Sequence, residues 1–364
     1  MAMFPPSIPH VFIRWLTKPG DVVYDPFSGR GTTAFEACLM DRVGLGADAN
    51  PLAWILTAAK IDPPTRSEVE HRLRQLKGVS RPFARMQAPK QIRAIFHPST
   101  LQQLLWLRGE LSPRRRVDRF LLASLLGGLH GNANMDGRPR GLTVSMPNTF
   151  AMAPRYVSRY IRRHRLRAPE VNVLNFLAQR VERYPPASGD LRRGGAWRQD
   201  ARVEPRLPAG AGPAKLIFTS PPYLQVMLYG KLNWIRHWLL GETPKEVDAR
   251  LFSSGCLPRY LTFLRVAMKN MRAGLRDDGF ICLVIGDVRR QSGEIHLAEQ
   301  VAQECLADTD LRVQGIVVDR LPVEHKVSRI WGKTKGRATR TDRILVLTAP
   351  KARLPRSMPS VSWH

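Results

Sequence analysis

The sequence has few acidic residues, few cysteines and no long apolar run, and each shortage excludes a class of protein. Its four cysteines are scattered, without a CxxC pair or a spacing with histidine that suits a metal ion, so we expect no metal site. Three of them lie in apolar stretches and are expected in the core. No segment approaches membrane-spanning length, and the N-terminus lacks the basic and apolar regions of a signal peptide. We therefore expect a soluble protein of the prokaryotic cytosol.

The shortage of acid leaves a large excess of positive charge. The 364 residues contain 57 Lys and Arg against 30 Asp and Glu, a formal net charge of +27. Such an excess attracts a polyanion and releases counterions from it, so we expect a nucleic-acid partner. A genome biased toward arginine would also raise this count. It would not explain why residues 65–195 carry 25 basic and 8 acidic residues, which is 25 − 8 = +17 of the total.

This basic segment, residues 65–195, differs from the rest of the chain. Its apolar residues recur at helical spacing, strand signals are few, and 23 of its 25 basic residues are Arg. The guanidinium group matches phosphate and the O6/N7 edge of guanine. We interpret the segment as a helical, DNA-facing recognition region; a surface helical subdomain is the alternative. The DNA contacts expected there, and in a basic loop near the C-terminus, are Arg138, Arg140, Arg159, Arg162, Arg163, Lys333, Lys335 and Arg337.

The flanking parts of the chain have an α/β pattern. A short apolar strand at 22–24, a helix at 32–40 and a second strand at 43–47 form a β-loop-α-β unit. Such a unit implies a parallel sheet that binds a ligand at its carboxyl edge. The pattern resumes near Asp200. There we expect strands at 216–219, 280–286, 312–319 and 343–348, and a helix at 258–274.

The loop of this unit, DPFSGRGTT at 25–33, suits a nucleotide-like cofactor. Gly29 and Gly31 leave room for a ligand against the backbone and tolerate positive φ. The N-terminus of the following helix attracts a carboxylate. Asp25, at the end of the first strand, can accept a hydrogen bond from an ammonium group. Asp48, at the end of the second strand, can accept from both hydroxyls of a ribose.

A second motif, TSPPY at 219–223, follows the apolar run 216–218. Its prolines fix φ and remove two backbone donors, so their carbonyls remain as acceptors. Tyr223 supplies a flat face, and Ser220 supplies a second acceptor. This set suits holding a planar ring by its face and its exocyclic amine by the amine hydrogens.

Together the two motifs resemble the amino-methyltransferases of DNA, which move a methyl group from S-adenosylmethionine to a base NH2. The resemblance covers about 1–64 and 196–350 and implies a Rossmann-like class I methyltransferase fold, α/β, with a mostly parallel seven-stranded sheet. The helical insert at 65–195 and a tail at 351–364 complete the expected domains. The cofactor-binding residues that the resemblance implies are Pro9, His10, Asp25, Phe27, Ser28, Gly29, Gly31, Thr32, Thr33, Asp48, Asp200 and Thr219.

Two of these residues have alternatives. The family implicates Pro9 and His10 at the methionine end of the cofactor, but His10 also suits a structural role. Asp200 matches the acidic residue that meets the adenine amine in relatives, although a capping residue or a solvated surface carboxylate is its other interpretation. Downstream, Asp287 follows a buried strand near the expected target pocket. We expect its carboxylate to order the loop of that pocket, and a capping role is the alternative. Trp234 and Trp238 are expected in the core.

The catalytic residues expected from the resemblance are Ser220, Pro221, Pro222 and Tyr223. Ser220 Oγ and the Pro221 carbonyl would accept from the amine, and Tyr223 would stack on a base that is flipped out of the duplex. Attack through cysteine, as on pyrimidine C5, is disfavoured because no Pro-Cys pair occurs; Cys256 does not match. In the family, Ser before Pro-Pro-Tyr goes mostly with cytosine N4, whereas Asp or Asn goes mainly with adenine N6.

We therefore expect a site-specific N4-methylcytosine-forming enzyme acting on double-stranded DNA, in restriction-modification or epigenetic marking. A cognate restriction endonuclease is a candidate partner, and a monomer or homodimer is expected. The alternatives are N6-adenine methylation and methylation of an RNA base amine; a nonenzymatic DNA-binding protein is disfavoured because both motifs are intact. The order of motifs resembles a circularly permuted relative, but the insert precedes Asp200, which departs from the family's usual arrangement.

Overall fold

A computed structural model of the chain describes residues 4–78, 88–130, 141–145, 152–183, 194–224, 227–290, 293–320 and 341–355. The chain divides into two compact units. The first unit contains Met1–Ile61, Leu191–Met227 and Phe252–His364. The second contains Asp62–Asp190 and Leu228–Leu251. The sequence prediction grouped 228–251 with the catalytic part, whereas its contacts are with the second unit.

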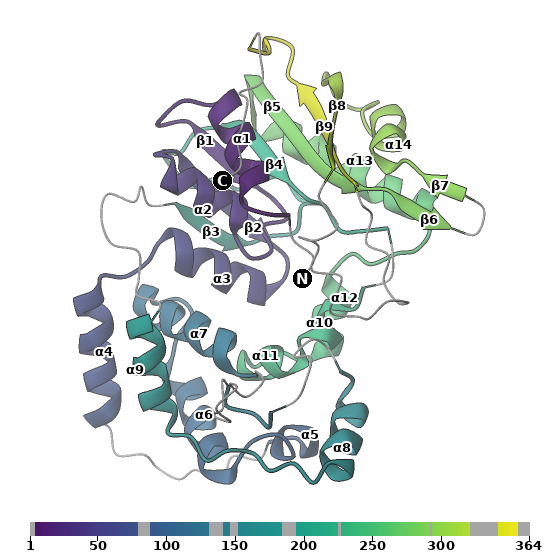
Figure 1. The fold of residues 1–364 in the computed structure, drawn as a ribbon. Helices are drawn as coiled ribbons and strands as arrows, with labels where there is room; N and C mark the ends of the chain where they lie inside the picture. Colours follow the sequence, from purple (N-terminus) through teal and green to yellow (C-terminus); the bar gives the residue numbers. More distant parts are fainter. Residues whose placement is uncertain are drawn as a thin grey trace. The chain divides into compact units, whose positions relative to one another are not determined.

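The first unit is organised by a seven-stranded sheet with the order β3-β2-β1-β4-β5-β9-β8 (Figure 1). Its strands are β1 Val22–Asp25, β2 Val43–Asp48, β3 Gly195–Arg198, β4 Ala214–Thr219, β5 Leu275–Gly286, β8 Arg312–Arg320 and β9 Thr341–Thr348. The pairs from β3 to β5 are parallel, and β9 is antiparallel to both of its neighbours. The predicted, mostly parallel seven-stranded sheet is confirmed. A separate hairpin joins β6, Val288–Arg290, to β7, Gly293–Ile295.

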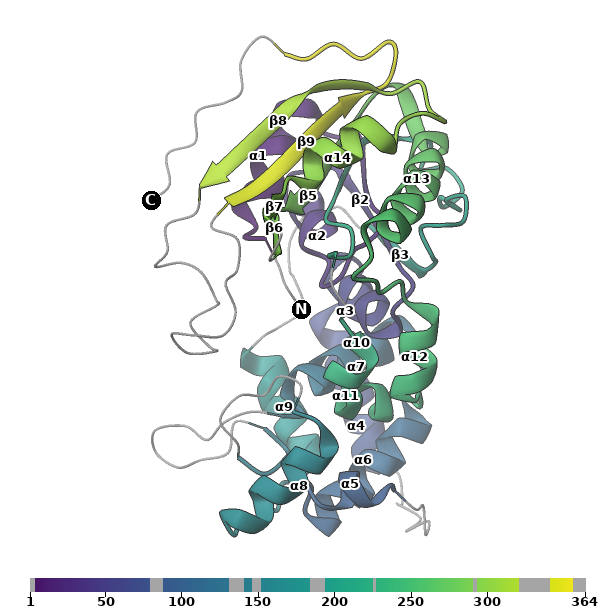
Figure 2. The ribbon, with the colours of Figure 1, turned by 90° about the vertical axis from the view of Figure 1, so that its right-hand side faces the viewer.

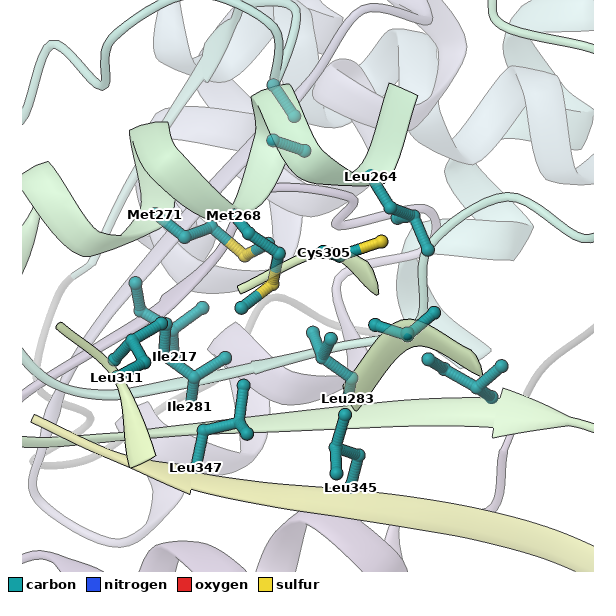
Figure 3. Close-up of a cluster of buried hydrophobic side chains, with 14 of the residues drawn as sticks. Ile217, Leu264, Met268, Met271, Ile281, Leu283, Cys305, Leu311, Leu345 and Leu347 are labelled. Atoms are coloured by element: carbon teal, nitrogen blue, oxygen red, sulfur yellow. The ribbon is translucent and has the colours of Figure 1, made fainter. Parts of the chain in front are cut away.

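Helices cover both faces of this sheet, and its inner strands β1, β4, β5 and β9 are accordingly continuous apolar runs. Along β5, Phe280, Cys282 and Val284 join one buried cluster, and the alternate residues join the other. The first face is covered by α1 (Ser7–Leu16) and α2 (Thr32–Leu39), and the opposite face by α13 (Leu257–Ala273) and α14 (Leu297–Glu304) (Figure 2). Figure 3 shows Met268 and Met271 of α13 above the apolar side chains of β4, β5 and β9.

Close approach of helices to β2 depends on two glycines. A Cβ at Gly44 would lie 2.0 Å from the carbonyl oxygen of Ala34 in α2. A Cβ at Gly46 would lie 2.8 Å from Cγ2 of Thr57, in α3 (Pro51–Ile61). At Gly44 the contact is with a backbone atom and cannot be relieved without moving α2, whereas at Gly46 the side chain of Thr57 would have to move. Packing of the two helices therefore explains both glycines of β2.

The sequence predicted most of these elements. The helix expected at 258–274 is α13, and three of the cysteines, Cys38, Cys282 and Cys305, are buried as expected. Strand β3 and helix α3 were not predicted. The four residues of β3, GAWR, form an edge strand that is not fully buried, so they lack the apolar run by which the inner strands were found.

In its described residues the second unit consists of helices, apart from one isolated β-bridge between Phe96 and Thr143. The helices are α4 Arg66–Gly78, α5 Lys90–Arg93, α6 Pro98–Glu110, α7 Arg116–Gly128, α8 Pro154–Arg163, α9 Val173–Arg183, α10 Tyr229–Leu232, α11 Trp234–Leu239 and α12 Pro244–Arg250. Trp234 and Trp238 are buried, as predicted. None of the helices in the described parts of the chain is long and apolar enough to cross a membrane.

The second unit contains a buried histidine, His237, whose titration is expected to make the stability of the protein depend on pH. His237 of α11 is fully buried, neither ring nitrogen has a hydrogen-bond partner within the described residues, and burial lowers its pKa to about 4. Because this folded-state pKa lies below the unfolded value, the unfolded state takes up the proton first as pH falls. The contribution of neutral His237 to stability is therefore lost between about pH 6.5 and pH 4.

Replacing His237 by leucine is expected to remove this loss. Between about pH 6.5 and pH 4, the free energy of unfolding of His237→Leu relative to the natural protein should rise by about 1.4 kcal/mol for each unit by which the pH falls. Urea unfolding at pH 7.5 and pH 5.5 measures the difference. His71→Leu, at an exposed position of α4, controls for the loss of an imidazole. An equal stability difference at the two pH values would contradict the assignment.

Candidate active site at the carboxyl edge of the sheet

The two sequence motifs meet at the reversal point of the sheet. From β1 the chain order runs outward to β2 and β3 on one side and to β4 and β5 on the other. Open α/β sheets bind ligands in the crevice outside the carboxyl ends of the strands at such a point. Asp25 is the last residue of β1 and Thr219 is the last residue of β4, so both motifs begin at this edge.

A direct hydrogen bond joins the motifs. The Thr219 hydroxyl donates to Oδ1 of Asp25 at 2.5 Å, and the Phe27 amide donates to the same oxygen at 3.1 Å. Burial raises the pKa of Asp25 to about 7, against the lowering effect of these hydrogen bonds, and the charge of Asp48 raises it further. Asp25 is therefore a buried carboxyl group, and no cation among the described residues compensates its charge.

Asp48 holds the glycine loop onto β2. Its Oδ2 accepts from the Gly29 amide at 2.9 Å, and its Oδ1 accepts from the Asn50 amide at 2.8 Å. Burial raises the pKa of Asp48 to about 6, the two amides lower it, and the charge of Asp200 raises it. Asp25, Asp48 and Asp200 thus follow one another along the ends of β1, β2 and β3, so that three carboxyl groups line this acidic edge of the sheet.

The two glycines of the loop have positive φ, +53° at Gly29 and +76° at Gly31, as the motif requires. The space around them differs. A Cβ at Gly29 would meet only the Phe27 carbonyl oxygen, at 3.8 Å, whereas a Cβ at Gly31 would lie 2.9 Å from Thr57 Cα. The expectation that both glycines leave room for a ligand needs correction, because at Gly31 the room is filled by α3.

The remaining loop residues are tied to their neighbours. The Ser28 amide donates to the Ala47 carbonyl at 3.0 Å, and its hydroxyl accepts from Thr57 Oγ1 at 3.2 Å. Thr32 and Thr33 begin α2, and Thr33 is buried. Lys60 Nζ donates to the Arg30 carbonyl at 2.6 Å, and burial lowers its pKa to about 8. Thr57 and Lys60 were not predicted, since nothing in the sequence relates α3 to the loop.

Two residues with open alternatives have partners inside the protein. His10 Nδ1 lies 2.6 Å from Glu36 Oε1, which joins α1 to α2, and the adjoining Pro9 is buried. Asp200 accepts from Arg202, with Nε 3.0 Å from each carboxylate oxygen and Nη2 2.6 Å from Oδ2. Any ligand contact at either residue has to share or replace these bonds.

In the second motif, the side chain of Ser220 is oriented by β5. Its hydroxyl donates to the Val284 carbonyl at 3.1 Å. A hydroxyl has one donor and two acceptor lone pairs, so Ser220 Oγ remains available only as an acceptor. Pro221 is buried, and Pro222 and Tyr223 are partly buried.

Aromatic rings surround this motif and the glycine loop. Tyr260 is fully buried. Its burial raises the pKa of its hydroxyl, and the charges of Cys305 and Tyr223 raise it further. Phe27 of the loop packs against Phe263 with ring centroids 5.9 Å apart, and Phe263 stacks on Phe252 at 4.0 Å. Phe252 and Phe263 were missed because aromatic residues at such positions also suit an ordinary core.

Asp287 belongs to a polar cluster near the end of β5. Its carboxylate accepts from Arg343 Nε at 2.8 Å, and Arg343 Nη1 also donates to Glu299 at 2.9 Å. Asp287, His296 and Glu299 each offer an atom within 4.8 Å of the others, which is a grouping that suits a metal ion. The Arg343 guanidinium already supplies a cation to both carboxylates, so the cluster is explained without a metal.

The predicted DNA contacts are only partly within the described residues. Arg159, Arg162 and Arg163 lie exposed on α8. The other five expected contacts lie outside the described residues: Arg138, Arg140, Lys333, Lys335 and Arg337.

The fold is similar to those of several solved structures, all at low identity. TrmN from Thermus thermophilus is 11% identical, with a TM-score of 0.36, and the match covers 95% of this chain and 49% of TrmN, so the chain spans about half of that protein. The rRNA methyltransferase AviRa from Streptomyces viridochromogenes is 10% identical, with a TM-score of 0.33 and coverage of 96% and 87%. LepI in complex with SAM is 10% identical, with a TM-score of 0.20 and coverage of 83% and 59%. Similarities this low carry no functional argument.

Comparison of the amino-acid sequence with known families is more specific than the comparison of folds. A search of curated proteins finds no match. Residues 1–54 match the family model N6_N4_Mtase, described as DNA methylase. The matched segment contains α1, the DPFSGRGTT loop with Asp25, and Asp48, and so includes two of the three acidic residues at the carboxyl edge. The match therefore supports an S-adenosylmethionine-dependent methyltransferase of the DNA N4/N6 methylase type.

Proposed function

We propose that the protein is a site-specific DNA methyltransferase that transfers a methyl group from S-adenosylmethionine to the N4 amine of a flipped cytosine in duplex DNA. The observation that carries the proposal is the hydrogen bond from Thr219 to Asp25 at the reversal point of the sheet. It joins a cofactor-type loop to an amine-holding motif across 194 positions of sequence. A protein that only bound the cofactor, or only held an amine, would not need the two motifs in contact.

On the cofactor side, the residues that would hold S-adenosylmethionine are those of the acidic edge. Asp25 would accept from the cofactor's ammonium group, and its uncompensated charge favours a cation there. Asp48 has lone pairs left for ribose hydroxyls beside the two amides that it already binds. Asp200 would serve the adenine amine if its bonds to Arg202 are shared. The bound cofactor supplies a methyl group already activated by its sulfonium centre.

On the base side, the difficulty is the nucleophile, because the lone pair of an exocyclic amine is delocalised into the ring. Ser220 Oγ, turned into an acceptor by its bond to the Val284 carbonyl, would take one amine hydrogen. The Pro221 carbonyl would take the other. Together these acceptors draw the nitrogen toward tetrahedral geometry and draw off positive charge as it forms. Tyr223 would stack on the flipped base and align it, which is where positioning contributes most.

Residues 65–195 are the proposed DNA-recognition region, on the basis of their arginine content. N4 of cytosine is favoured as the target because Ser, and not Asp or Asn, precedes Pro-Pro-Tyr. The alternatives are N6 of adenine and a base amine of RNA; Ser and Asp are both acceptors, so the mechanism is common to all three.

The product of the reaction distinguishes these targets. We would incubate the protein, in separate reactions, with unmethylated genomic DNA and with total RNA, each with S-adenosylmethionine labelled in its methyl group. Digestion to nucleosides and mass spectrometry would then identify the labelled nucleoside. N4-methylcytosine is the expected result. N6-methyladenine would contradict the assignment of cytosine as the target base but would agree with the proposed mechanism of methyl transfer. Label in RNA but none in DNA would overturn the substrate.

The charge state of Asp25 predicts a pH dependence of cofactor binding. Its pKa of about 7 means that half of the ligand-free protein carries a protonated, uncharged Asp25 at that pH. Since an ammonium group favours the ionised carboxylate, affinity for S-adenosylmethionine should fall by about tenfold between pH 8 and pH 6. Calorimetric titration without DNA measures this. Asp25→Asn should bind weakly and lose the dependence; a variant that retains it would assign the titration to another group.

A further inference from the structure

Helix α8 (Pro154–Arg163) lies in the proposed DNA-recognition region and has a surface that takes no part in the methyl-transfer step. Of its ten residues only Val157 is buried. Residues four apart in a helix lie one above the other on the same face. Two such columns run side by side along the exposed part of α8. One column contains Arg155, Arg159 and Arg163, and the other contains Tyr156, Tyr160 and His164.

The aromatic column forms a stack with an open end. The rings of Tyr160 and His164 are 4.2 Å apart between centroids, and those of Tyr156 and Tyr160 are 6.1 Å apart and inclined by 26°. Tyr156 is the terminal ring and is 44% exposed. It is the one aromatic residue among the large hydrophobic side chains exposed in the described residues. A further planar group placed on Tyr156 would extend the stack.

The arginine column is not explained by intramolecular pairing. Across the described residues, Arg155, Arg159 and Arg163 form no ion pair. The first turn of α8 contains no acidic residue. A basic residue in the last turn of a helix, such as Arg163, interacts favourably with the helix dipole and stabilises the helix. Arg155 lies at the opposite end, where a positive charge is unfavourable, so the helix itself gives no reason for it.

We propose that this face of α8 binds an unpaired stretch of DNA, with a base stacked on Tyr156 and phosphates contacted by the arginine column. Exposed aromatic rings beside a row of basic side chains are how proteins bind single strands, and every base has a face that can stack. Bases within a duplex are stacked on one another about 3.4 Å apart and offer no free face. The occupant is therefore a strand whose pairing is interrupted. The inference rests on the proposed function in assuming that the substrate is DNA.

Fluorescence anisotropy with a labelled single-stranded oligonucleotide and the duplex of the same sequence tests the proposal, without cofactor. Tyr156→Ala should weaken single-strand binding by about tenfold and change duplex binding much less. Tyr156→Phe, which keeps the ring, should bind as the natural protein does. The double variant Arg155→Gln, Arg159→Gln should reduce the slope of log affinity against log salt by about 0.7 per arginine, whereas Tyr156→Ala should leave it unchanged.

Arg14→Gln, on exposed Arg14 of α1, is the matched control for charge and should leave single-strand binding within a factor of two or so. The proposal is overturned if Tyr156→Ala binds single strands normally, if it loses the same factor on the duplex, or if the double arginine variant behaves as Arg14→Gln does. Binding that favours RNA of the same sequence would overturn the assignment to DNA. Because no methyl transfer is measured, failure here is separate from failure of the proposed reaction.

Discussion

Replacing Ser220 by alanine is expected to reduce kcat for methyl transfer by about 10²-fold, while the affinity for S-adenosylmethionine stays within a factor of two or so. The reason is the orientation of its hydroxyl. Because the hydroxyl donates its hydrogen to the Val284 carbonyl, only its lone pairs face away from β5. The proposed mechanism needs such a lone pair to accept a hydrogen bond from the base amine as positive charge develops on the nitrogen. Alanine removes that acceptor but leaves the acidic edge that would hold the cofactor. Single-turnover kinetics with saturating DNA, together with calorimetric titration of the cofactor, measure the two effects.

Ser220→Asn is the conservative variant for this test. Its amide NH2 can donate to the Val284 carbonyl while its carbonyl oxygen accepts from the base amine, so part of the lost rate should return. Ser220→Ala with an unchanged kcat would remove the serine from the machinery. A parallel loss of cofactor affinity would instead assign Ser220 to the cofactor half of the site.

The largest effect on stability is expected from Gly44→Ala. A Cβ at this position of β2 would lie 2.0 Å from the carbonyl oxygen of Ala34 and 2.8 Å from Cys38 Sγ. A backbone oxygen cannot rotate away as a side chain can, so α2 would have to move off the sheet, and with it the loop that α2 follows. We expect a loss of more than about 3 kcal/mol in the free energy of unfolding, measured by urea titration, or a failure to accumulate as folded protein.

Two controls separate the cause. Gly109→Ala makes the same change at an exposed position of α6, where a Cβ meets nothing within 4 Å, and should stabilise by about 0.5 kcal/mol. Adding Cys38→Ala to Gly44→Ala relieves only the sulfur contact and should not restore stability. Recovery in that double variant would show that the side chain, and not the backbone of α2, sets the limit.

Several structural features were predictable from local pattern. Strand β1, its glycine loop, α2 and β2 follow directly from two apolar runs separated by a glycine-rich turn and a helical repeat. The residues of β5 and β9 alternate between the two buried faces, and such continuous apolar runs indicate strands covered on both sides. By contrast, β3 was missed, because an edge strand of four partly buried residues has too few apolar positions to produce a pattern.

Partners that are distant in sequence could not be predicted in the same way. Neither the pairing of His10 with Glu36 nor the contact of Thr57 with Gly31 has a local signal, since each depends on how a helix packs after the sheet has formed. The two glycines of one motif illustrate this. Both need positive φ, which sequence indicates, but only the packing of α3 reveals that Gly31 also makes room for Thr57.

The class of sheet, the two motifs with their chemical groups, and the concentration of arginine in residues 65–195 all follow from the amino-acid sequence, because they depend on residue type and short spacing. The contact of Thr219 with Asp25, the hydrogen bond from Ser220 to β5 and the position of Tyr156 at the end of an exposed ring stack are known only from the folded chain. Hydrogen bonding and burial act between neighbours in space, and β1 and β4 become neighbours only when the sheet assembles from residues far apart in the chain.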